Sequence, residues 1–384
     1  MVKAGIIGVG FIGAAHIEAL RRLGNVEVAA VSNSDPERLE ANRARYGVPK
    51  AYVDWREMVR DPGVDVIHIC TPNHLHYEMT KAALLAGKHV VGEKPITTCR
   101  AEAEELVRLA GELGLVNAID FNIRYYPLVR QLSQMVAKGE LGEVFAVHGS
   151  YLQDWLFYGT DYNWRLETAM AGRSRAVADI GSHWMDTIEY VTGDRIAEVC
   201  ADFATFRKVR MKPLRPVETY AGKIETPDAY ESIPIGTEDY ATVMFRLGGG
   251  GRGSFTVSQV SAGRKNRIQF EVDGSESSAA WESELPNQMW LGRRDAANGL
   301  LLKDPSLLYP ESRELADYPG GHNEGHPDTF KMLFRDIYAD ITAEPGERRD
   351  PPTYPTFADG LREIALCDAI CESDKKGGWV KVWA

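Results

Sequence analysis

The sequence predicts an α/β chain of two domains: an N-terminal doubly wound parallel sheet and a C-terminal α+β domain with an open, mostly antiparallel sheet. Three observations support this. The 384 residues exceed what one hydrophobic core usually supports. Short apolar strands alternate with amphipathic helices up to about residue 121, and beyond about residue 140 apolar residues recur at every second position. We place the domains at residues 1–122 and 123–384.

The first domain is expected to contain five buried strands rich in Val and Ile, with helices between them. The strands are expected at residues 4–8, 26–31, 65–70, 89–91 and 116–121. Residues 100–113 carry their apolar side chains on one helical face and are followed by Gly114, a typical helix end. Repeated strand–helix–strand units of this kind form a doubly wound parallel sheet.

The second domain is expected to begin with antiparallel strands and to end with helices. Residues 240–247, 253–260 and 267–274 alternate apolar and polar side chains, which predicts strands with one solvated or partner-facing side. Helices are expected at residues 327–341 and 357–371. Residues 208–237 hold four prolines and many charges and predict a long excursion, either a lid or an arm to another subunit.

Bulk composition excludes several classes of protein. A formal charge of −11 and a pI near 5.4 argue against nucleic acid as a partner. Five scattered cysteines without CxxC spacing argue against a disulfide framework and favour a reducing, cytoplasmic location. The sequence contains no run of 18 apolar residues and therefore predicts no membrane span.

A glycine-rich turn predicts a dinucleotide site of the Rossmann type. Gly8-Val9-Gly10-Phe11-Ile12-Gly13 has the pattern G-x-G-x-x-G, directly after a strand and at the start of a helix. The first glycine permits a tight turn, the second lets a pyrophosphate approach the backbone, and the third lets helix and strand pack closely. The alternative is a tight turn with a purely structural role. We expect Gly8, Gly10, Phe11 and Ile12 to contact the cofactor.

The end of the second strand leaves the choice between NAD and NADP open, with NAD favoured. No acidic residue stands at the strand tip, where one would bind the ribose and repel a 2′-phosphate. Ser32 and Asn33 could bond to either group, and Arg38 could pair with a phosphate. Asp35, followed by a proline, is better explained as the N-cap of the next helix.

Two features predict catalytic side chains. Lys94 follows the strand at residues 88–92 and therefore lies at its carboxyl end, where open α/β sheets bind ligands and where an ammonium could stabilise an alkoxide. Asp179 and His183, four residues apart, lie on one side of a helical turn, so that the carboxylate can orient the imidazole. The alternatives are a solvated loop lysine and a structural Asp–His pair.

Taken together, these motifs resemble the glucose-fructose oxidoreductase, inositol dehydrogenase and rhizopine-catabolism (Gfo/Idh/MocA) family over nearly the whole chain. The matching stretches are "GIIGVGFIGAAH", "ICTPNHLHYEM", "GEKPITT", "FNIRYYP", "GELGEV" and "DIGSHWMD". The resemblance implies a Rossmann domain, a second domain used for homo-oligomerisation as a dimer or tetramer, and hydride exchange between a nicotinamide cofactor and a sugar or polyol. It implies that Lys94, Asp179 and His183 contact the reacting carbinol.

The resemblance also assigns further contacts. It implies cofactor contacts at Thr71, Pro72, Asn73, His76, Glu93, Lys94, Asn122, Trp164 and Arg165. The substrate residues that we expect are Lys94, Arg124, Gln153, Asp154, Trp155, Asp179, His183 and His322. Within the family, the stretches "GSYLQDW" and "DYNWR" look most like the pyranose-oxidising members of the levoglucosan dehydrogenase and glycoside 3-dehydrogenase type.

We therefore predict an NAD(P)-dependent dehydrogenase acting on a secondary hydroxyl of a pyranose or cyclitol. Which of Lys94 and His183 is the formal base stays open. No metal site is expected, because the pairs His74/His76 and His322/His326 have no recognisable third ligand. Two other functions compete with this prediction: an NAD-dependent glycosidase that oxidises, eliminates and re-reduces its substrate, and a non-catalytic dinucleotide sensor.

Overall fold

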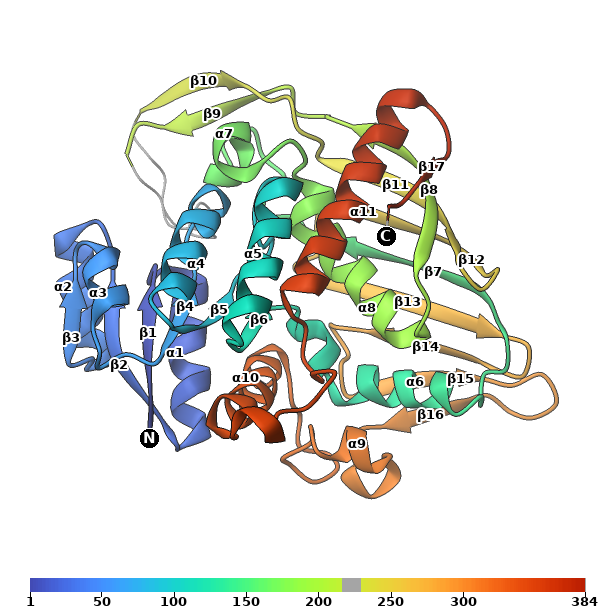
Figure 1. Ribbon diagram of the computed structural model, residues 1–384. Coiled ribbons are helices and arrows are strands. Elements are labelled where there is room, and N and C mark those ends of the chain that lie inside the picture. Colours follow the sequence, from blue (N-terminus) through green and yellow to red (C-terminus); the bar gives the residue numbers. More distant parts are fainter. Residues whose placement is uncertain (216–228, 384) are drawn as a thin grey trace. The chain divides into compact units, whose positions relative to one another are not determined.

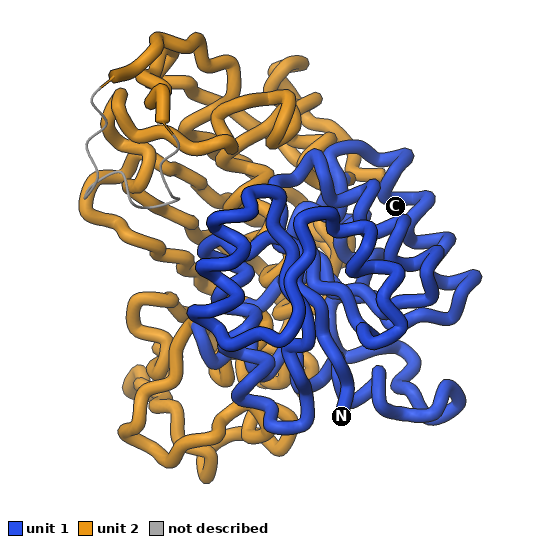
Figure 2. The backbone as a smooth tube through the Cα atoms, turned by 90° about the vertical axis from the view of Figure 1, so that its left-hand side faces the viewer, with its two compact units in different colours: residues 1–122, 327–364 blue, residues 123–326, 365–384 orange. Residues whose placement is uncertain are grey.

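The computed structural model describes residues 1–215 and 229–383, which form two compact units (Figure 2). The first unit comprises residues 1–122 and 327–364, and the second comprises residues 123–326 and 365–384. The break after residue 122 coincides with the expected domain boundary. Residues 327–364, expected in the second domain, belong instead with the first unit, because their aromatic side chains complete its core.

A six-stranded parallel sheet forms the centre of the first unit, in the order β3-β2-β1-β4-β5-β6 (Figure 1). Its strands are β1 (Val2–Ile7), β2 (Val26–Ser32), β3 (Lys50–Tyr52), β4 (Val66–Ile69), β5 (His89–Gly92) and β6 (Asn117–Ile119). The order reverses between β1 and β4, which confirms the predicted doubly wound sheet. The sequence did not reveal β3, since its three residues are half-buried or exposed and have no apolar pattern.

Helices connect these strands, and their ends follow from local sequence. They are α1 (Phe11–Leu23), α2 (Pro36–Tyr46), α3 (Trp55–Arg60), α4 (His76–Leu85) and α5 (Arg100–Leu113), with a short 3-10 turn at Asn73–Leu75. Helix α10 (His326–Thr342), much later in the chain, joins this unit from residue 327 onward. The side chain of Asp35 accepts hydrogen bonds from the backbone N–H groups of Glu37 and Arg38, which confirms it as the N-cap of α2. The first part of α11 (Phe357–Lys376) is tied to β6, since the backbone N–H of Phe357 donates to Asn117.

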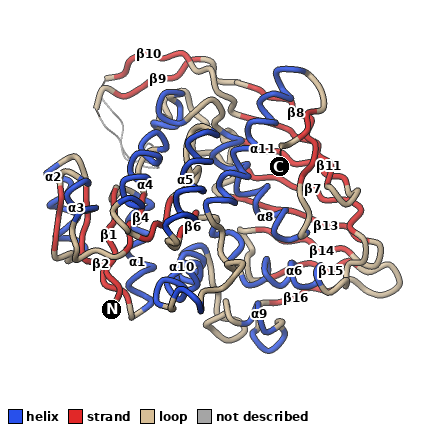
Figure 3. The backbone as a smooth tube through the Cα atoms, viewed as in Figure 1, coloured by secondary structure: helices blue, strands red, loops and turns tan. Residues whose placement is uncertain are grey.

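A nine-stranded sheet forms the second unit, in the order β16-β15-β14-β13-β7-β12-β11-β8-β17 (Figure 3). The strands are β7 (Val144–Leu152), β8 (Ile196–Ala204), β11 (Tyr240–Leu247), β12 (Arg252–Ser258), β13 (Arg267–Gly274), β14 (Ser278–Glu282), β15 (Gln288–Gly292), β16 (Gly299–Leu302) and β17 (Val380–Lys381). Strands β7 and β12 pair in parallel, and the other pairings described in this sheet are antiparallel. The sheet is therefore mostly antiparallel, as predicted.

Helices and a two-stranded ribbon complete the second unit. The helices are α6 (Pro127–Ala137), α7 (Thr168–Ala171), a π-helix (Val177–Gly181), α8 (Ser182–Thr192), α9 (Pro310–Arg313) and the last part of α11. The 3-10 turns are at Asn122–Tyr125, Trp164–Leu166 and Pro305–Leu307. A further 3-10 turn, at Pro345–Glu347, belongs to the first unit. The buried Trp184 of α8 stacks on Phe255 of the sheet at 4.5 Å between ring centroids. This contact fixes α8 against the sheet.

The excursion expected at residues 208–237 is partly described. Strands β9 (Val209–Pro213) and β10 (Tyr230–Pro234) pair as an antiparallel ribbon, whereas residues 216–228 lie outside the described residues. Arg210 of β9 is fully buried and donates to the carboxylate of Asp239 at 2.9 Å. Within residues 1–215 and 229–383, no helix has both the length and the apolar character needed to cross a bilayer.

Candidate active site

The glycine turn between β1 and α1 has the geometry of a nucleotide cradle. Gly8 has a φ of +88°, and a Cβ atom there would come within 2.7 Å of the carbonyl oxygen of Cys70. A Cβ on Gly13 would lie 2.1 Å from the carbonyl oxygen of Gly8, so this glycine permits the close packing of helix and turn. A Cβ on Gly10 would meet nothing within 4 Å. The open space at Gly10, at the start of a helix, fits the pyrophosphate of a dinucleotide.

The tip of β2 carries the predicted ribose-reading residues. Ser32 is buried, and its carbonyl oxygen accepts a hydrogen bond from the backbone N–H of Gly8. The side-chain oxygen of Asn33 accepts from the backbone N–H of Asp35 at 2.9 Å. Arg38 is half exposed and lies 3.5 Å from the Asp35 carboxylate. No acidic side chain stands directly at the strand tip, in agreement with the sequence.

The carboxyl ends of β4 and β5 are connected by His76, the first residue of α4. Its Nδ1 lies 2.7 Å from the carbonyl oxygen of Pro95 and its Nε2 lies 2.8 Å from that of Thr71. Both ring nitrogens of this buried residue thus face backbone oxygens of the two loops. His76 therefore holds the loop with Lys94 against the loop after β4, and a direct cofactor contact stays a prediction. Lys94 itself is half-buried.

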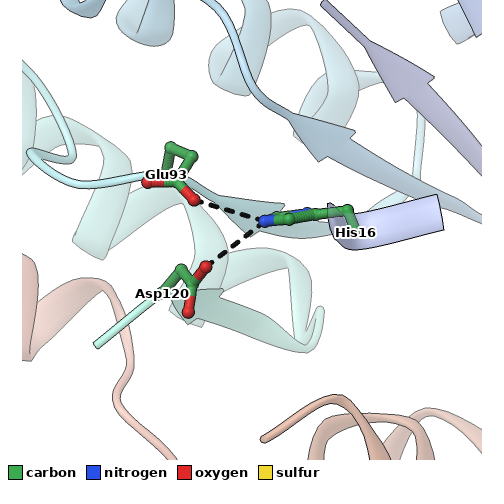
Figure 4. A group of neighbouring side chains, drawn as sticks. All are labelled: His16, Glu93 and Asp120. Atoms are coloured by element: carbon green, nitrogen blue, oxygen red, sulfur yellow. Dashed lines mark hydrogen bonds and ion pairs between the residues drawn. The ribbon is translucent and has the colours of Figure 1, made fainter. Parts of the chain in front are cut away.

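A cluster of three side chains, His16, Glu93 and Asp120, lies near the carboxyl ends of β5 and β6 (Figure 4). Nε2 of His16, on α1, is 3.2 Å from Oε1 of Glu93 and 3.3 Å from Oδ2 of Asp120. Glu93 and Asp120 follow the neighbouring strands β5 and β6. From the sequence, Glu93 is predicted only as a cofactor contact, and neither His16 nor Asp120 is predicted as a site residue.

The cluster has strongly perturbed acid–base behaviour. Burial works against the charged form of Glu93, yet the hydrogen bond and charge of His16 lower its pKa to about 2. Burial and the charge of Glu93 raise the pKa of Asp120 to about 7. Burial also opposes charging of His16, but Cys70, Asp120 and Glu93 together hold its pKa well above the usual value. Glu93 and Asp120 therefore share one proton, which the pair binds below neutral pH and releases to solvent above it.

The second unit positions Asp179 with two donors. Oδ1 accepts from Nε of Arg165 at 2.9 Å, and Oδ2 accepts from Nε2 of Gln259 at 2.8 Å. The Arg165 guanidinium also stacks on the Trp164 ring, 4.4 Å from its centroid. Arg165 and Trp164 were predicted as cofactor contacts, and within this unit Arg165 is a partner of Asp179. Gln259, which lies 80 residues away and directly after β12, is not predicted from the sequence.

His183 follows Asp179 within one continuous helical run, so the predicted helical relation of the two residues is confirmed. This run begins at Val177, which places His183 in its second turn. The start of the run is held by the buried Glu238, whose Oε1 accepts from the backbone N–H groups of Arg175 and Val177 at 2.8 and 3.0 Å. Glu238 therefore satisfies helix-start donors ahead of Asp179.

The remaining predicted residues are held by neighbours within their own units. Arg124 pairs with Asp186, and Asn122 donates to Thr329 at 2.8 Å. Gln153 accepts from Nε1 of Trp155 at 2.7 Å and donates to Asn266 at 2.6 Å. Asp154 accepts from Lys265 at 2.5 Å, and His322 is exposed. Gln153 and Trp155 thus pair with each other and with Asn266 within the fold, and their contact with substrate stays a prediction.

A cavity of about 500 Å³ lies in the second unit and is lined by residues of the stretches 154–161 and 262–265. Asp154 and Lys265 form part of its wall, together with the rings of Phe157 and Tyr158. Its lining includes neither Asp179 nor His183. We therefore assign this cavity no role in the chemical step.

Comparison with known proteins agrees with this geometry. The model of the oxidoreductase family with an NAD-binding Rossmann fold matches residues 2–121, and that of the GFO/IDH/MocA C-terminal domain matches residues 129–280. Levoglucosan dehydrogenase of Pseudarthrobacter phenanthrenivorans is 30% identical, covering 99% of this chain and 98% of that protein. Glucose-6-phosphate 3-dehydrogenase of Bacillus subtilis is 25% identical, covering 97% of each chain. A solved levoglucosan dehydrogenase with NADH and levoglucosan superimposes with a TM-score of 0.87 at 27% identity, covering all of both chains.

The glycine cradle, the parallel sheet and the matched models define an oxidoreductase with an NAD-binding Rossmann domain. The chain belongs to the Gfo/Idh/MocA oxidoreductase family. The family, the fold class and the nicotinamide cofactor predicted from the sequence are thereby confirmed.

Proposed function

We propose that this protein is an NAD-dependent dehydrogenase that exchanges hydride with a secondary hydroxyl of a pyranose or cyclitol. The observation that carries the proposal is the Asp179 carboxylate, held by Arg165 and Gln259 one helical turn before His183. A fixed carboxylate four residues before an imidazole in one helical run is suited to orienting that imidazole for proton transfer from a hydroxyl. The similarity to levoglucosan dehydrogenase over the full length supports a pyranose as substrate.

The roles of the residues follow from their chemistry. His183 takes the proton of the reacting hydroxyl, and Asp179 fixes the orientation of the imidazole. Lys94, at the carboxyl end of β5, stabilises the alkoxide or relays its proton. The bound nicotinamide supplies the hydride acceptor. Both His183 and Lys94 are suited to be the formal base, and the pH dependence of their variants would distinguish them.

The proposal is tested by turnover on a panel of pyranoses, anhydro sugars and cyclitols with NAD⁺ and NADP⁺, followed by the absorbance of the reduced cofactor. We expect Lys94→Ala to lower kcat by about 10²–10⁴-fold, with NADH affinity nearly unchanged. Lys81→Ala is a matched control, because Lys81 pairs with Glu105 on the surface of the same unit. Equal loss of turnover and of NADH binding in Lys94→Ala would show that the lysine only holds the fold.

The same panel separates the competing functions. Release of an aglycone without net formation of NADH would identify a glycosidase that re-reduces its product. Binding of dinucleotide without turnover of any sugar would favour a sensor. The homo-oligomer and the cytoplasmic location also remain proposals; light scattering and cell fractionation test them.

A further inference from the structure

The His16–Glu93–Asp120 cluster continues into a longer chain of buried polar side chains within the first unit. Nδ1 of His16 lies 3.0 Å from Nδ1 of His68, and Nε2 of His68 lies 2.9 Å from the Tyr338 hydroxyl. A protonated His16 can donate to the carboxylates through Nε2 and to His68 through Nδ1. A neutral His68 can then donate to the hydroxyl oxygen through Nε2. Every contact along the chain therefore has one donor and one acceptor.

Of the groups in contact with His16, His68 and Cys70 are neutral, so the carboxylates of Glu93 and Asp120 balance the positive charge of His16. Burial and the charge of His16 lower the pKa of His68, which keeps it neutral. Burial raises the pKa of Cys70, whose sulfur lies 3.4 Å from Nδ1 of His16, so this thiol is also neutral. The titratable and charged groups that face the cluster are His68 and Cys70 from β4 and its end, His76 of α4, Glu93 and Lys94 after β5, Asp120 after β6, and Tyr338 of α10.

The position of the cluster connects it to the cofactor. A doubly wound sheet binds a dinucleotide along the carboxyl ends of its strands, with one mononucleotide over each half of the sheet. The glycine turn belongs to the half with β1, β2 and β3, so the nicotinamide half falls to β4, β5 and β6. Glu93 and Asp120 follow two of these three strands. The cluster is therefore below the half of the sheet that takes the nicotinamide.

We propose that the His16–Glu93–Asp120 cluster releases a proton to solvent when NAD⁺ binds, and retains it when NADH binds. This inference rests on the nicotinamide cofactor of the proposed function. The oxidised ring carries one positive charge and the reduced ring carries none. A cation over β4–β6 favours the ionised form of the two carboxylates, so the shared proton becomes more acidic. NADH lacks this charge and leaves the proton in place.

The size of the effect follows from electrostatics. At an effective dielectric constant of about 20, a unit charge within roughly 10 Å of another shifts a pKa by about one unit. The shared proton exchanges near pH 7, so a downward shift of one unit releases about 0.4 proton at that pH. By linkage, the affinity for NAD⁺ should rise up to about tenfold relative to NADH between about pH 6 and pH 8.

Calorimetric titration measures directly how many protons are released when the nucleotide binds. Chelator-treated protein is titrated with NAD⁺ or NADH at pH 7 in two buffers of different ionisation enthalpy, PIPES and imidazole. We expect release of about 0.4 proton with NAD⁺ and close to none with NADH. In Asp120→Asn the difference between the nucleotides should disappear while NADH still binds. Glu18→Gln is the matched control, because Glu18 is exposed on the same helix as His16.

Several results would overturn the inference. Equal proton exchange with both nucleotides in the unaltered protein would do so, even if Asp120→Asn failed to fold. An unchanged difference in a folded Asp120→Asn variant would do so as well. One ring nitrogen of His16 and one carboxylate oxygen each of Glu93 and Asp120 lie within 4.8 Å of one another, close enough to hold a metal ion. A tightly held metal that survives the chelator would therefore also contradict a proton-sharing cluster. Failure of both nucleotides to bind would reject the cofactor itself, whereas proton release without sugar turnover would reject only the proposed reaction.

Discussion

Gln259 offers the sharpest test of the proposed role of Asp179. Its Nε2 donates to Oδ2 of Asp179 at 2.8 Å, and its side chain is fully buried. Gln259→Leu keeps most of the volume but removes this donor. A hydrogen bond to a charged group contributes about 1.5–3 kcal/mol. If the bond serves to orient the carboxylate in the transition state, its loss lowers kcat by roughly 10- to 150-fold.

The assay compares kcat with the affinity for NADH, which should stay within about twofold of the unaltered protein because Gln259 is outside the glycine cradle. A double-mutant cycle with Asp179→Asn then asks whether Gln259 acts through Asp179, in which case adding Gln259→Leu causes almost no further loss. Gln269→Leu is the control, since Gln269 donates to Ser150 instead. Unchanged kcat in folded Gln259→Leu, or additive losses in the cycle, would refute the positioning argument.

Three further substitutions separate fold from function. Asp239→Asn should lower the free energy of unfolding by about 3–5 kcal/mol in urea denaturation, because the buried guanidiniums of Arg175 and Arg210 lose their shared carboxylate; a loss below about 1 kcal/mol would contradict this. Gly13→Ala should destabilise the first unit in the same measurement, since its Cβ meets a backbone oxygen at 2.1 Å. Gly10→Ala should keep stability but weaken NADH binding measured by calorimetry, because its Cβ occupies the open cradle; equal effects of the two alanines would reject the distinction.

The fold could be predicted because its signals are local. Apolar runs separated by amphipathic helices indicated the parallel sheet, and alternation in residues 267–274 indicated the antiparallel one. The helix at residues 100–113 has the predicted bounds, since an αL glycine ends it. The placement of Lys94 at a strand end, and of Asp179 and His183 in one helical run, could also be predicted from motifs.

The contacts that support these residues could not be predicted, since they join distant parts of the chain. His16 and Asp120 meet only because α1 begins, and β6 ends, at the same edge of the sheet. One signal was available: Asp120 is an acidic residue at the end of an apolar strand, and such a residue is seldom buried without a partner. Gln259 and Glu238 carry no such signal, because polar residues in strand loops are common. Residues 327–364 gave no sign that they belong with the first unit.

The two units contribute to the proposed reaction by different physical means, and this difference has a measurable consequence. In the first unit, we propose that backbone geometry at the glycine turn and the charge of the buried cluster act on the cofactor. In the second unit, side-chain donors hold Asp179, which we propose takes part in the chemical step. Asp120→Asn should therefore change the dependence of NAD⁺ affinity on pH, whereas Gln259→Leu should change kcat and leave that dependence unaltered. Opposite effects of the two variants would mean that the roles of the two units are reversed.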